Sequence, residues 1–500
     1  MTYLNSYTET KKTPTTELKT MDDWARLERS LILGSEEGVY NTLDRPAATR
    51  NLNSVKACLR SDGLRVVRTV VDIVASGRPP KNTPALQVLA LASSASFADQ
   101  ITNASALAAL PQVARTGSDL LAFAAFVDGI RGWGRGLRTA IANWYVSKPA
   151  GELAYQIMTH AGLGNWKHSD LIRLSHPKAE TPALNAVFQW AVDGELGHLA
   201  TADIRHGVLR HVYAIEQVKK AAHEFEVVRW IEDVRLTHEM IPPQWKQSAA
   251  VWEALLENMP YAAMVSQLEK MTEAGLLAPQ SAATALVVAR LMDRKRVANA
   301  KIDPFTLLFV WLEYRQNKGL SNIQNAIEDA FYLAFENIEA PIGNVYLAIY
   351  PGVPVHWAAA LAMALVRGKG ELIAASVHQD RLRNMNINRQ DRLAGVCKAI
   401  GAESSAVEGS PAVWLPLDDA RRNRIAVDSF VVLTGEFCDD RRTATALEEY
   451  RRAMETPAKL VVVAMTADEV VISDPAGVDE LYVAGFDASV PAVIGDFLRG

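Results

Sequence analysis

The sequence predicts a multidomain protein in which an α-helical repeat array precedes a doubly wound α/β domain. Apolar residues recur at helical spacing from Trp24 to about residue 337, and short continuous apolar runs alternate with helical segments after residue 341. The chain has 500 residues, of which 49% are hydrophobic and 22% charged, so it is long enough for several domains with large cores.

The N-terminal segment, residues 1–20, is polar and rich in threonine. It lacks the apolar stretch of a secretion signal, and we predict a flexible arm. No apolar run approaches the ~20 residues that a membrane span needs. The three cysteines, Cys58, Cys397 and Cys438, are far apart and odd in number, which favours a reduced, cytoplasmic compartment over a disulfide scaffold.

Helical hairpins are predicted over residues 21–340. In "VWEALLENM", Trp252, Leu255, Leu256 and Met259 recur at the spacing of one helical stripe. Segments that contain Pro and Gly, such as "SGRPPKN" and "MIPPQW", separate successive helices. The pattern is typical of a HEAT-like helical-repeat array, although the repeats are too irregular to assign a period.

A different pattern begins at residue 341 and continues to residue 500. The runs "VYLAIY", "ELIAASV", "SFVVLT" and "KLVVVAM" predict strands that are buried on both faces. Helical segments at Trp357–Arg367, Asp391–Ile400 and Arg442–Met454 separate them. This alternation predicts a parallel, doubly wound sheet. The loop after its first strand, "YPGVPV", lies where such domains usually hold their chemistry, yet it contains no acid and no phosphate cradle.

Five stretches of the helical part resemble the TROVE module, which is named for telomerase, Ro and vault proteins. They are "LERSLILGSEEGVY", "SGRPPKNTPALQVLALA", "GWGRGLRTAIANWY", "NWKHSDLIRLSHPK" and "VWEALLENMPYAAMVSQLEKMT". Near the C-terminus, "RRAMETPAKLVVVAMTADEVVISDP" followed by "VAGFD" resembles the end of the von Willebrand factor A domain of Ro proteins. The chain from about residue 20 thus resembles a bacterial or phage Ro ribonucleoprotein (the Ro autoantigen family).

The resemblance implies a HEAT-like ring at residues 21–340 and a von Willebrand factor A-like domain at residues 341–500. A ring closed within one chain implies a monomer. In the family, Y RNAs bind the outer surface of the ring and single-stranded 3′ ends of misfolded RNAs enter its hole. We therefore expect a Y-like small RNA and RNA 3′ ends as ligands, in RNA quality control or processing. The protein partner that the resemblance suggests is an exoribonuclease or another RNA-processing protein.

The metal site of the family is expected to be lost. Family members carry Asp-x-Ser-x-Ser after the first strand, together with a Thr and a later Thr-Asp, which supply the hard oxygen ligands that Mg²⁺ requires. The corresponding positions here are Tyr350, Gly352, Pro354, Pro411 and Gly435. We expect no metal or cofactor there, with the domain kept as a fold. No acid, base and nucleophile converge elsewhere in the sequence, so we do not expect an enzyme.

Residues 128–178 carry the basic charge expected of an RNA surface. They hold seven Lys and Arg against three Asp and Glu, a net charge of +4 in a chain of −5. Cations interleaved with aromatic residues suit phosphate contact and base stacking. Taken alone, the cations are better explained by a solvated helix face, and the resemblance reverses this preference in favour of RNA. Trp133, Trp144 and Trp166 are expected in the core. The residues predicted to contact RNA are Arg131, Arg135, Arg138, Lys148, His160, Lys167, His168, Arg173, Lys178 and, from the turn "SGRPPKN", Lys81.

An alternative function is a protein-interaction scaffold that has lost RNA and metal binding. The net charge of −5 and the altered metal loop favour it. The stretch "MTHAGLGNW" favours it too, because relatives often carry a Lys- and Arg-rich run there. Cations that are tied up in ion pairs would support the scaffold, whereas free cations would support RNA binding.

Overall fold

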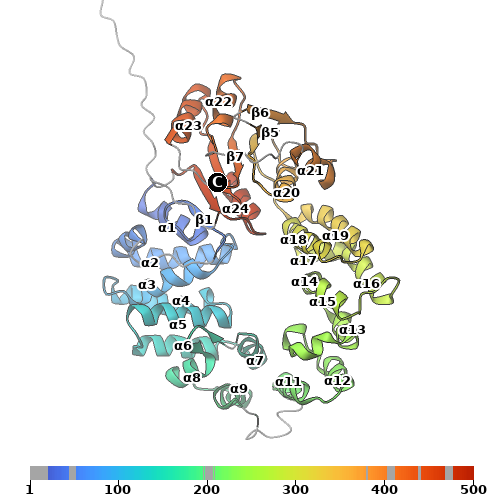
Figure 1. Ribbon diagram of the computed structural model, residues 1–500. Coiled ribbons are helices and arrows are strands. Elements are labelled where there is room, and N and C mark those ends of the chain that lie inside the picture. The colour runs from blue at the N-terminus through green and yellow to red at the C-terminus, as the bar shows by residue number, and fades with distance from the viewer. Residues whose placement is uncertain are drawn as a thin grey trace, which may run out of the picture.

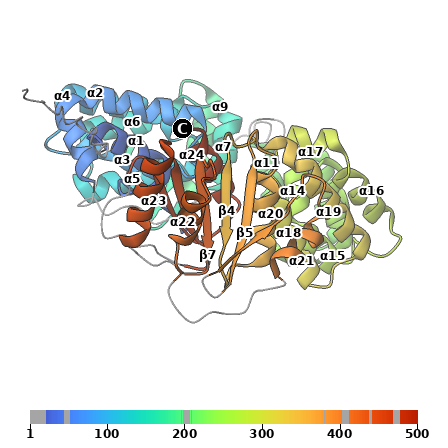
Figure 2. The ribbon, with the colours of Figure 1, turned by 90° about the horizontal axis from the view of Figure 1, so that it is seen from above.

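The computed structural model shows a chain arranged as a ring around an open centre (Figure 1). The N-terminal helices descend one side, further helices ascend the other, and the C-terminal α/β domain lies between the two ends of the array (Figures 1 and 2). The predicted fold class is confirmed. The structure describes residues 21–43, 52–160, 162–194, 196, 207, 209–378, 381–401, 411–436, 441–467 and 477–500, so the predicted arm at residues 1–20 lies outside the described residues.

The first side of the ring is a stack of helices with one short hairpin. Its elements are α1 (Asp23–Leu33), α2 (Asn53–Ser76), α3 (Thr83–Ser94), α4 (Gln100–Val113), α5 (Gly117–Ile130), α6 (Arg135–Val146), α7 (Ala150–Thr159), β2 (Gly162–Leu163), β3 (Trp166–Lys167), α8 (His168–Ser175) and α9 (Pro182–Asp193). Helix α2 packs on α4, α3 on α5, α4 on α6, and α6 on α8. Contacts between helices two positions apart are typical of stacked hairpins, as the sequence predicts.

The second side continues this stack. Its elements are α11 (Arg210–Lys220), α12 (Glu224–Val234), 3₁₀ turns at His238–Met240 and Pro243–Gln247, α13 (Ala249–Asn258), α14 (Tyr261–Ser266), α15 (Leu268–Glu273), α16 (Ala282–Leu291), α17 (Arg294–Ala300), α18 (Pro304–Gln316), α19 (Ser321–Ala334) and a 3₁₀ turn at Phe335–Asn337. Helix α11 joins the two sides because its first part, with Val212, packs into the core of the first side, whereas Val218 packs into that of the second.

The C-terminal domain is built on a seven-stranded sheet in the order β1-β9-β8-β7-β4-β5-β6. The strands are β1 (Val39–Asn41), β4 (Val345–Ile349), β5 (Leu372–His378), β6 (Arg381–Met385), β7 (Ser429–Thr434), β8 (Lys459–Ala464) and β9 (Glu480–Ala484). All neighbours are parallel except β5 and β6. The helices of the domain are α20 (Val355–Leu365), α21 (Leu393–Gly401), α22 (Leu415–Arg422), α23 (Arg441–Met454) and α24 (Val490–Arg499).

Both faces of this sheet are buried, which explains the continuous apolar runs in the sequence. In β4, Leu347 packs into the core that α20, α21 and α24 share with the helical array. Its neighbours Tyr346 and Ala348 face the opposite core, which α22 and α23 cover. The four strands predicted from these runs form as β4, β5, β7 and β8.

The sequence analysis did not predict β1, which lies in the N-terminal half yet pairs with β9 at the edge of the C-terminal sheet. It closes the ring. The Tyr40 hydroxyl shares a 2.7 Å hydrogen bond with Ser489 Oγ. Next to this strand, Arg29 of α1 is only 9% exposed, and burial lowers its pKa to about 10. It donates hydrogen bonds to three carbonyl oxygens of the C-terminal domain, those of Gly477, Val478 and Glu480.

Aromatic packing joins the other end of the helical array to the C-terminal domain. Phe309 of α18 and Trp357 of α20 have ring centroids 3.9 Å apart, and Trp357 also packs on Phe486. The Leu393 backbone N–H of α21 donates to the Tyr332 hydroxyl of α19. Both ends of the array therefore contact the same sheet domain.

Candidate nucleic-acid interface

Three exposed arginines lie at the junction of α5 and α6. Arg131 caps the C-terminal end of α5, Arg135 begins α6, and Arg138 lies one turn further along α6. Within the described residues, none of their guanidinium groups has a hydrogen-bond or ion-pair partner. Gly134, the N-cap of α6, offers no capping side chain, so the first N–H groups of that helix face no competing side-chain acceptor at the cap.

Two further exposed lysines flank α8. Lys167 ends the β2–β3 hairpin, and its backbone N–H donates to Asp170 Oδ2 at 3.1 Å, which fixes the start of α8. Lys178 follows the end of α8. Across the described part of the chain, neither ammonium group has a recorded partner.

A pair of half-buried tryptophans places the hairpin against the loop that precedes α6. The ring centroids of Trp133 and Trp166 are 5.0 Å apart, with planes inclined by 46°. The start of α6, with Arg135, therefore lies near the β2–β3 hairpin, with Lys167. Trp144, in contrast, is fully buried, and its Nε1 donates to the Ala114 carbonyl at 2.6 Å. The prediction of core positions is right for Trp144, whereas Trp133 and Trp166 lie at the border of core and surface.

We call Arg131, Arg135, Arg138, Lys167 and Lys178 the α6–α8 basic surface.

Two further predicted cations near it have protein partners. Lys148 Nζ lies 4.6 Å from the Trp144 ring centroid and 3.5 Å from Glu152 Oε1. Arg173 is exposed but donates to the Val192 carbonyl at 2.7 Å, near the end of α9. Both can contribute positive potential but have fewer free donors for a phosphate.

Lys81, which the sequence analysis predicts to contact RNA, lies apart from the α6–α8 basic surface, next to β1. Its Nζ donates to the carbonyl oxygens of Asn41 and Thr42 at 2.9 and 2.7 Å. It therefore anchors the end of β1. Arg78, from the same turn, pairs with Asp496 at 2.9 Å, so this turn serves ring closure.

His168, which the sequence analysis also predicts to contact RNA, has a side chain that is only 2% exposed. Its Nδ1 and the Tyr145 hydroxyl share a 2.7 Å hydrogen bond. Its Nε2 faces Gly117, where an added Cβ would lie 2.7 Å from it. Burial lowers the pKa of His168 to about 4, so the ring is neutral at physiological pH. The neighbouring His160 is half-buried, and its Nδ1 lies 2.9 Å from Ser118 Oγ.

The buried His168 predicts a specific loss of stability in acid. The unfolded chain binds a proton at this ring near pH 6.5, whereas the folded chain binds it only near pH 4. The stability that depends on neutral His168 is therefore complete above pH 6.5 and falls by roughly 2–3 kcal/mol as the pH drops towards 4. We expect His168→Asn to remove this contribution, measured as the difference between variant and wild type in urea unfolding from pH 7.5 to 4.5.

The matched control for that measurement is His176→Asn. His176 is exposed at the end of α8 with a positive φ of 47°, which asparagine tolerates. The free energy of unfolding of this variant should change with pH in parallel with that of the wild type. Parallel profiles for His168→Asn as well would contradict the assignment of a neutral, buried His168.

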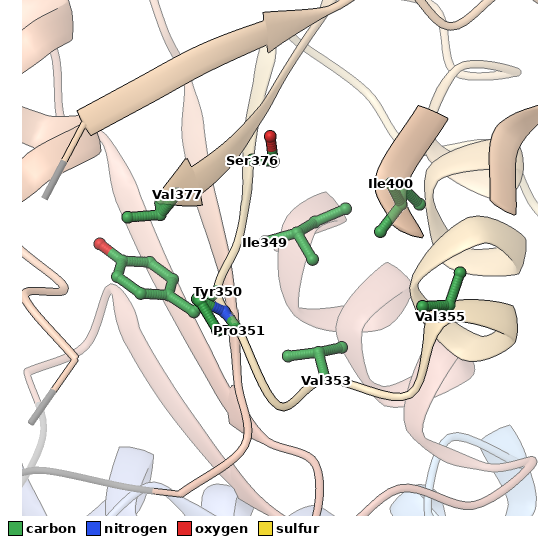
Figure 3. Close-up of a pocket in the computed structure, with 8 residues that line it drawn as sticks. All are labelled: Ile349, Tyr350, Pro351, Val353, Val355, Ser376, Val377 and Ile400. Carbon is green, nitrogen blue, oxygen red and sulfur yellow. The ribbon is translucent and has the colours of Figure 1, made fainter. Parts of the chain in front are cut away.

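The loop where the family's metal site is expected to be lost is packed with apolar side chains. Figure 3 shows Ile349, Val353, Val355 and Ile400 converging there, around a cavity of about 10 Å³. That is room for a single water molecule. The Tyr350 hydroxyl donates to the Ala412 carbonyl at 2.5 Å, which ties the loop to the segment that follows Pro411.

The other residues at the family's metal positions are also packed within the protein. Thr434 is 1% exposed, and its hydroxyl donates to the Val463 carbonyl at 3.3 Å. Gly352 lies against Gly435, with no side chain from either position. Pro354 is the N-cap of α20. Mg²⁺ requires several hard oxygen ligands, and these residues do not fit it.

A groove of about 650 Å³ lies near the basic surface, between the two sides of the ring. From the first side, Lys167 and Trp190 line it; from the second, Lys219, Met240 and Ile241 do. Lys219 was not predicted as a site residue. Its only sequence signal is the pair "KK" at the end of a helical segment.

No three His, Cys, Asp or Glu side chains of the described residues gather closely enough to hold a metal ion. Among the helices that the structure describes, none is long and apolar enough to span a membrane.

Comparison with known proteins shows the family. The sequence matches the TROVE domain over residues 11–226 and 231–313, and the Ro60 vWA domain over residues 343–498. It is 31% identical to a Deinococcus radiodurans protein named RNA-binding protein RO60, over 96% of this chain and 93% of that one. A Caenorhabditis elegans protein of the same name is 25% identical over 96% of this chain and 88% of its own.

The fold agrees with these matches. The crystal structure of the Deinococcus radiodurans RO (RSR) protein superposes with a TM-score of 0.86 at 29% identity, covering 96% of this chain and all of that one. The likeness therefore extends over the whole ring and is not confined to one domain. The chain belongs to the Ro60 family, with a TROVE domain followed by a Ro60-type von Willebrand factor A domain.

Proposed function

We propose that this chain is a non-catalytic RNA-binding protein of the Ro60 type, and that the α6–α8 basic surface contacts the phosphate backbone of its RNA. The observation that carries this proposal is that all five cations of that surface are exposed and, among the described residues, lack protein partners. Unpaired cations around a tryptophan pair suit phosphate contact combined with base stacking. The names of the relatives from Deinococcus radiodurans and Caenorhabditis elegans support it.

The ligands we propose are a Y-like small RNA on the outside of the ring and the single-stranded 3′ ends of misfolded RNAs. The ring arrangement around an open centre supports the second (Figure 1). The protein would act as a cytoplasmic monomer in RNA quality control or processing, alongside an exoribonuclease or another RNA-processing protein.

A salt titration of RNA binding tests the proposal. We expect a structured RNA with a single-stranded 3′ tail to bind the full chain at low salt, with a log–log salt slope of roughly −3 to −5 if most of the basic surface contacts phosphate. Filter binding at several salt concentrations measures it. Binding no tighter than that of an acidic control protein at low salt would defeat the proposal.

A second candidate function is the protein-interaction scaffold. The partners of Lys81, Lys148 and Arg173, together with the packed metal loop, favour it because they remove potential ligand contacts. The same titration separates the two functions, since a scaffold without RNA binding predicts no salt-dependent retention of RNA.

A further inference from the structure

An exposed aromatic pair lies at the start of α12, the helix that follows α11, and α11 lines the groove with Lys219. Phe225 is 65% exposed, although it is a large apolar side chain. The ring of His223, the N-cap of α12, stacks on it with centroids 5.6 Å apart and planes 13° from parallel. The apolar stripe that buries α12 consists of Val227, Ile231 and Val234. Phe225 is off that stripe, so packing does not explain it.

Two exposed lysines precede this pair in sequence. Lys219 and Lys220 form the last turn of α11, only a short turn before His223. Over the residues that the structure describes, neither ammonium group has a recorded partner. A flat aromatic surface beside free cations is the arrangement that binds single-stranded nucleic acid, since every base has a face for stacking and every linkage a negative charge.

The neighbouring acids are largely satisfied within the protein. Glu224 accepts a hydrogen bond from the Ser248 hydroxyl at 2.6 Å, and Glu226 accepts one from the Ala222 backbone N–H at 3.1 Å. These hydrogen bonds hold the two carboxylates in place but leave their charges, which Lys219 and Lys220 balance.

The groove joins the α6–α8 basic surface to the last turn of α11, which precedes this pair in sequence. Lys167 of that surface and Lys219 of α11 line the same cavity of about 650 Å³. Glu216 and Glu239 also line it, so its four charged side chains sum to zero. We expect phosphate contact at Lys219, which lines the groove, and at Lys220, which follows it in sequence, while Trp190 and the apolar lining of the groove suit bases.

We propose that His223 and Phe225, with Lys219 and Lys220, form a second contact for single-stranded RNA, reached across the groove from the α6–α8 basic surface. This inference rests on the proposed function and names the part of the RNA that α12 would hold. Bases stack on the aromatic pair, and the adjoining phosphates meet the two lysines. The double-stranded part of the RNA stays on the basic surface.

The test compares two RNAs on the full chain. One is a hairpin with a 3′ tail of about ten nucleotides, and the other is the same hairpin without a tail. We expect Phe225→Ala to weaken binding of the tailed RNA about tenfold, because one stacked base is lost, and to leave the tailless RNA unchanged. The double variant Lys219→Ala/Lys220→Ala should reduce the salt slope for the tailed RNA by about 1.4.

The matched control is Ile101→Ala on α4, which removes another apolar side chain that is 70% exposed. It should change neither affinity. Wild-type protein that binds neither RNA would defeat the proposed function itself. Wild-type protein that binds both RNAs while Phe225→Ala binds the tailed RNA equally well would overturn only this inference. Equal weakening of both RNAs by Phe225→Ala would overturn it too.

Discussion

Reversing the charge of Arg135 and Arg138 together is expected to lower the affinity for structured RNA by about 100-fold. Each exposed guanidinium would lose a charge-assisted contact of roughly 1.5 kcal/mol, and two such losses correspond to about that factor. Repulsion between the new carboxylates and phosphate adds to it. Fluorescence anisotropy with a labelled hairpin RNA measures the change in dissociation constant for Arg135→Glu/Arg138→Glu.

A matched control separates this local effect from net charge. Arg68 on α2 and Lys295 on α17 are exposed and, among the described residues, have no recorded side-chain partner. Arg68→Glu/Lys295→Glu changes the net charge by the same amount and should weaken binding only a few-fold. Equal losses in both double variants would show that overall charge, and not the α6–α8 basic surface, governs binding.

The second large effect is expected on stability, at the contact between Arg29 of α1 and the C-terminal domain. Arg29→Met keeps most of the side-chain volume but removes the hydrogen bonds to Gly477, Val478 and Glu480. Three carbonyl oxygens at a buried junction then lose their donor, and we expect the free energy of unfolding to fall by roughly 3–5 kcal/mol. Urea unfolding measures the loss. Hydrogen exchange localises it, because the Tyr482 amide that bonds to the Gly38 carbonyl should lose protection.

Arg78→Met is the comparison for that experiment. Arg78 spans the same junction to Asp496, but its side chain is 41% exposed. An exposed ion pair contributes about 1 kcal/mol or less, so this variant should be nearly as stable as the wild type. Equal losses of stability in Arg29→Met and Arg78→Met would contradict the claim that the buried contacts of Arg29 stabilise ring closure.

The sequence predicts those strands whose burial on both faces leaves a continuous run of apolar residues. β4, β5, β7 and β8 are apolar runs between helical segments, because both faces of a central parallel strand are covered. β1 has no such signal: it is only three residues long, and its partner β9 lies near the other end of the chain. β6, an edge strand with the sequence "RLRNM", looks like a polar loop.

The sequence predicts the positive charge of the candidate site but not which of its cations are free to contact RNA. Residues 128–178 are visibly basic, yet which cations are free depends on tertiary partners, such as the carbonyl oxygens that hold Lys81. For His168 a local signal did exist. His168, Leu171, Ile172 and Ser175 share one buried stripe of α8, so helical spacing alone would have placed the histidine inside.

The most direct test of the central claim is to map where RNA touches the protein. A structured RNA containing 4-thiouridine, crosslinked to the full chain and analysed by mass spectrometry, should label residues 131–138 and the segment from Trp166 to Lys178. That result would place the RNA on the α6–α8 basic surface. Crosslinks confined to other parts of the ring, with these two segments unlabelled, would contradict the account.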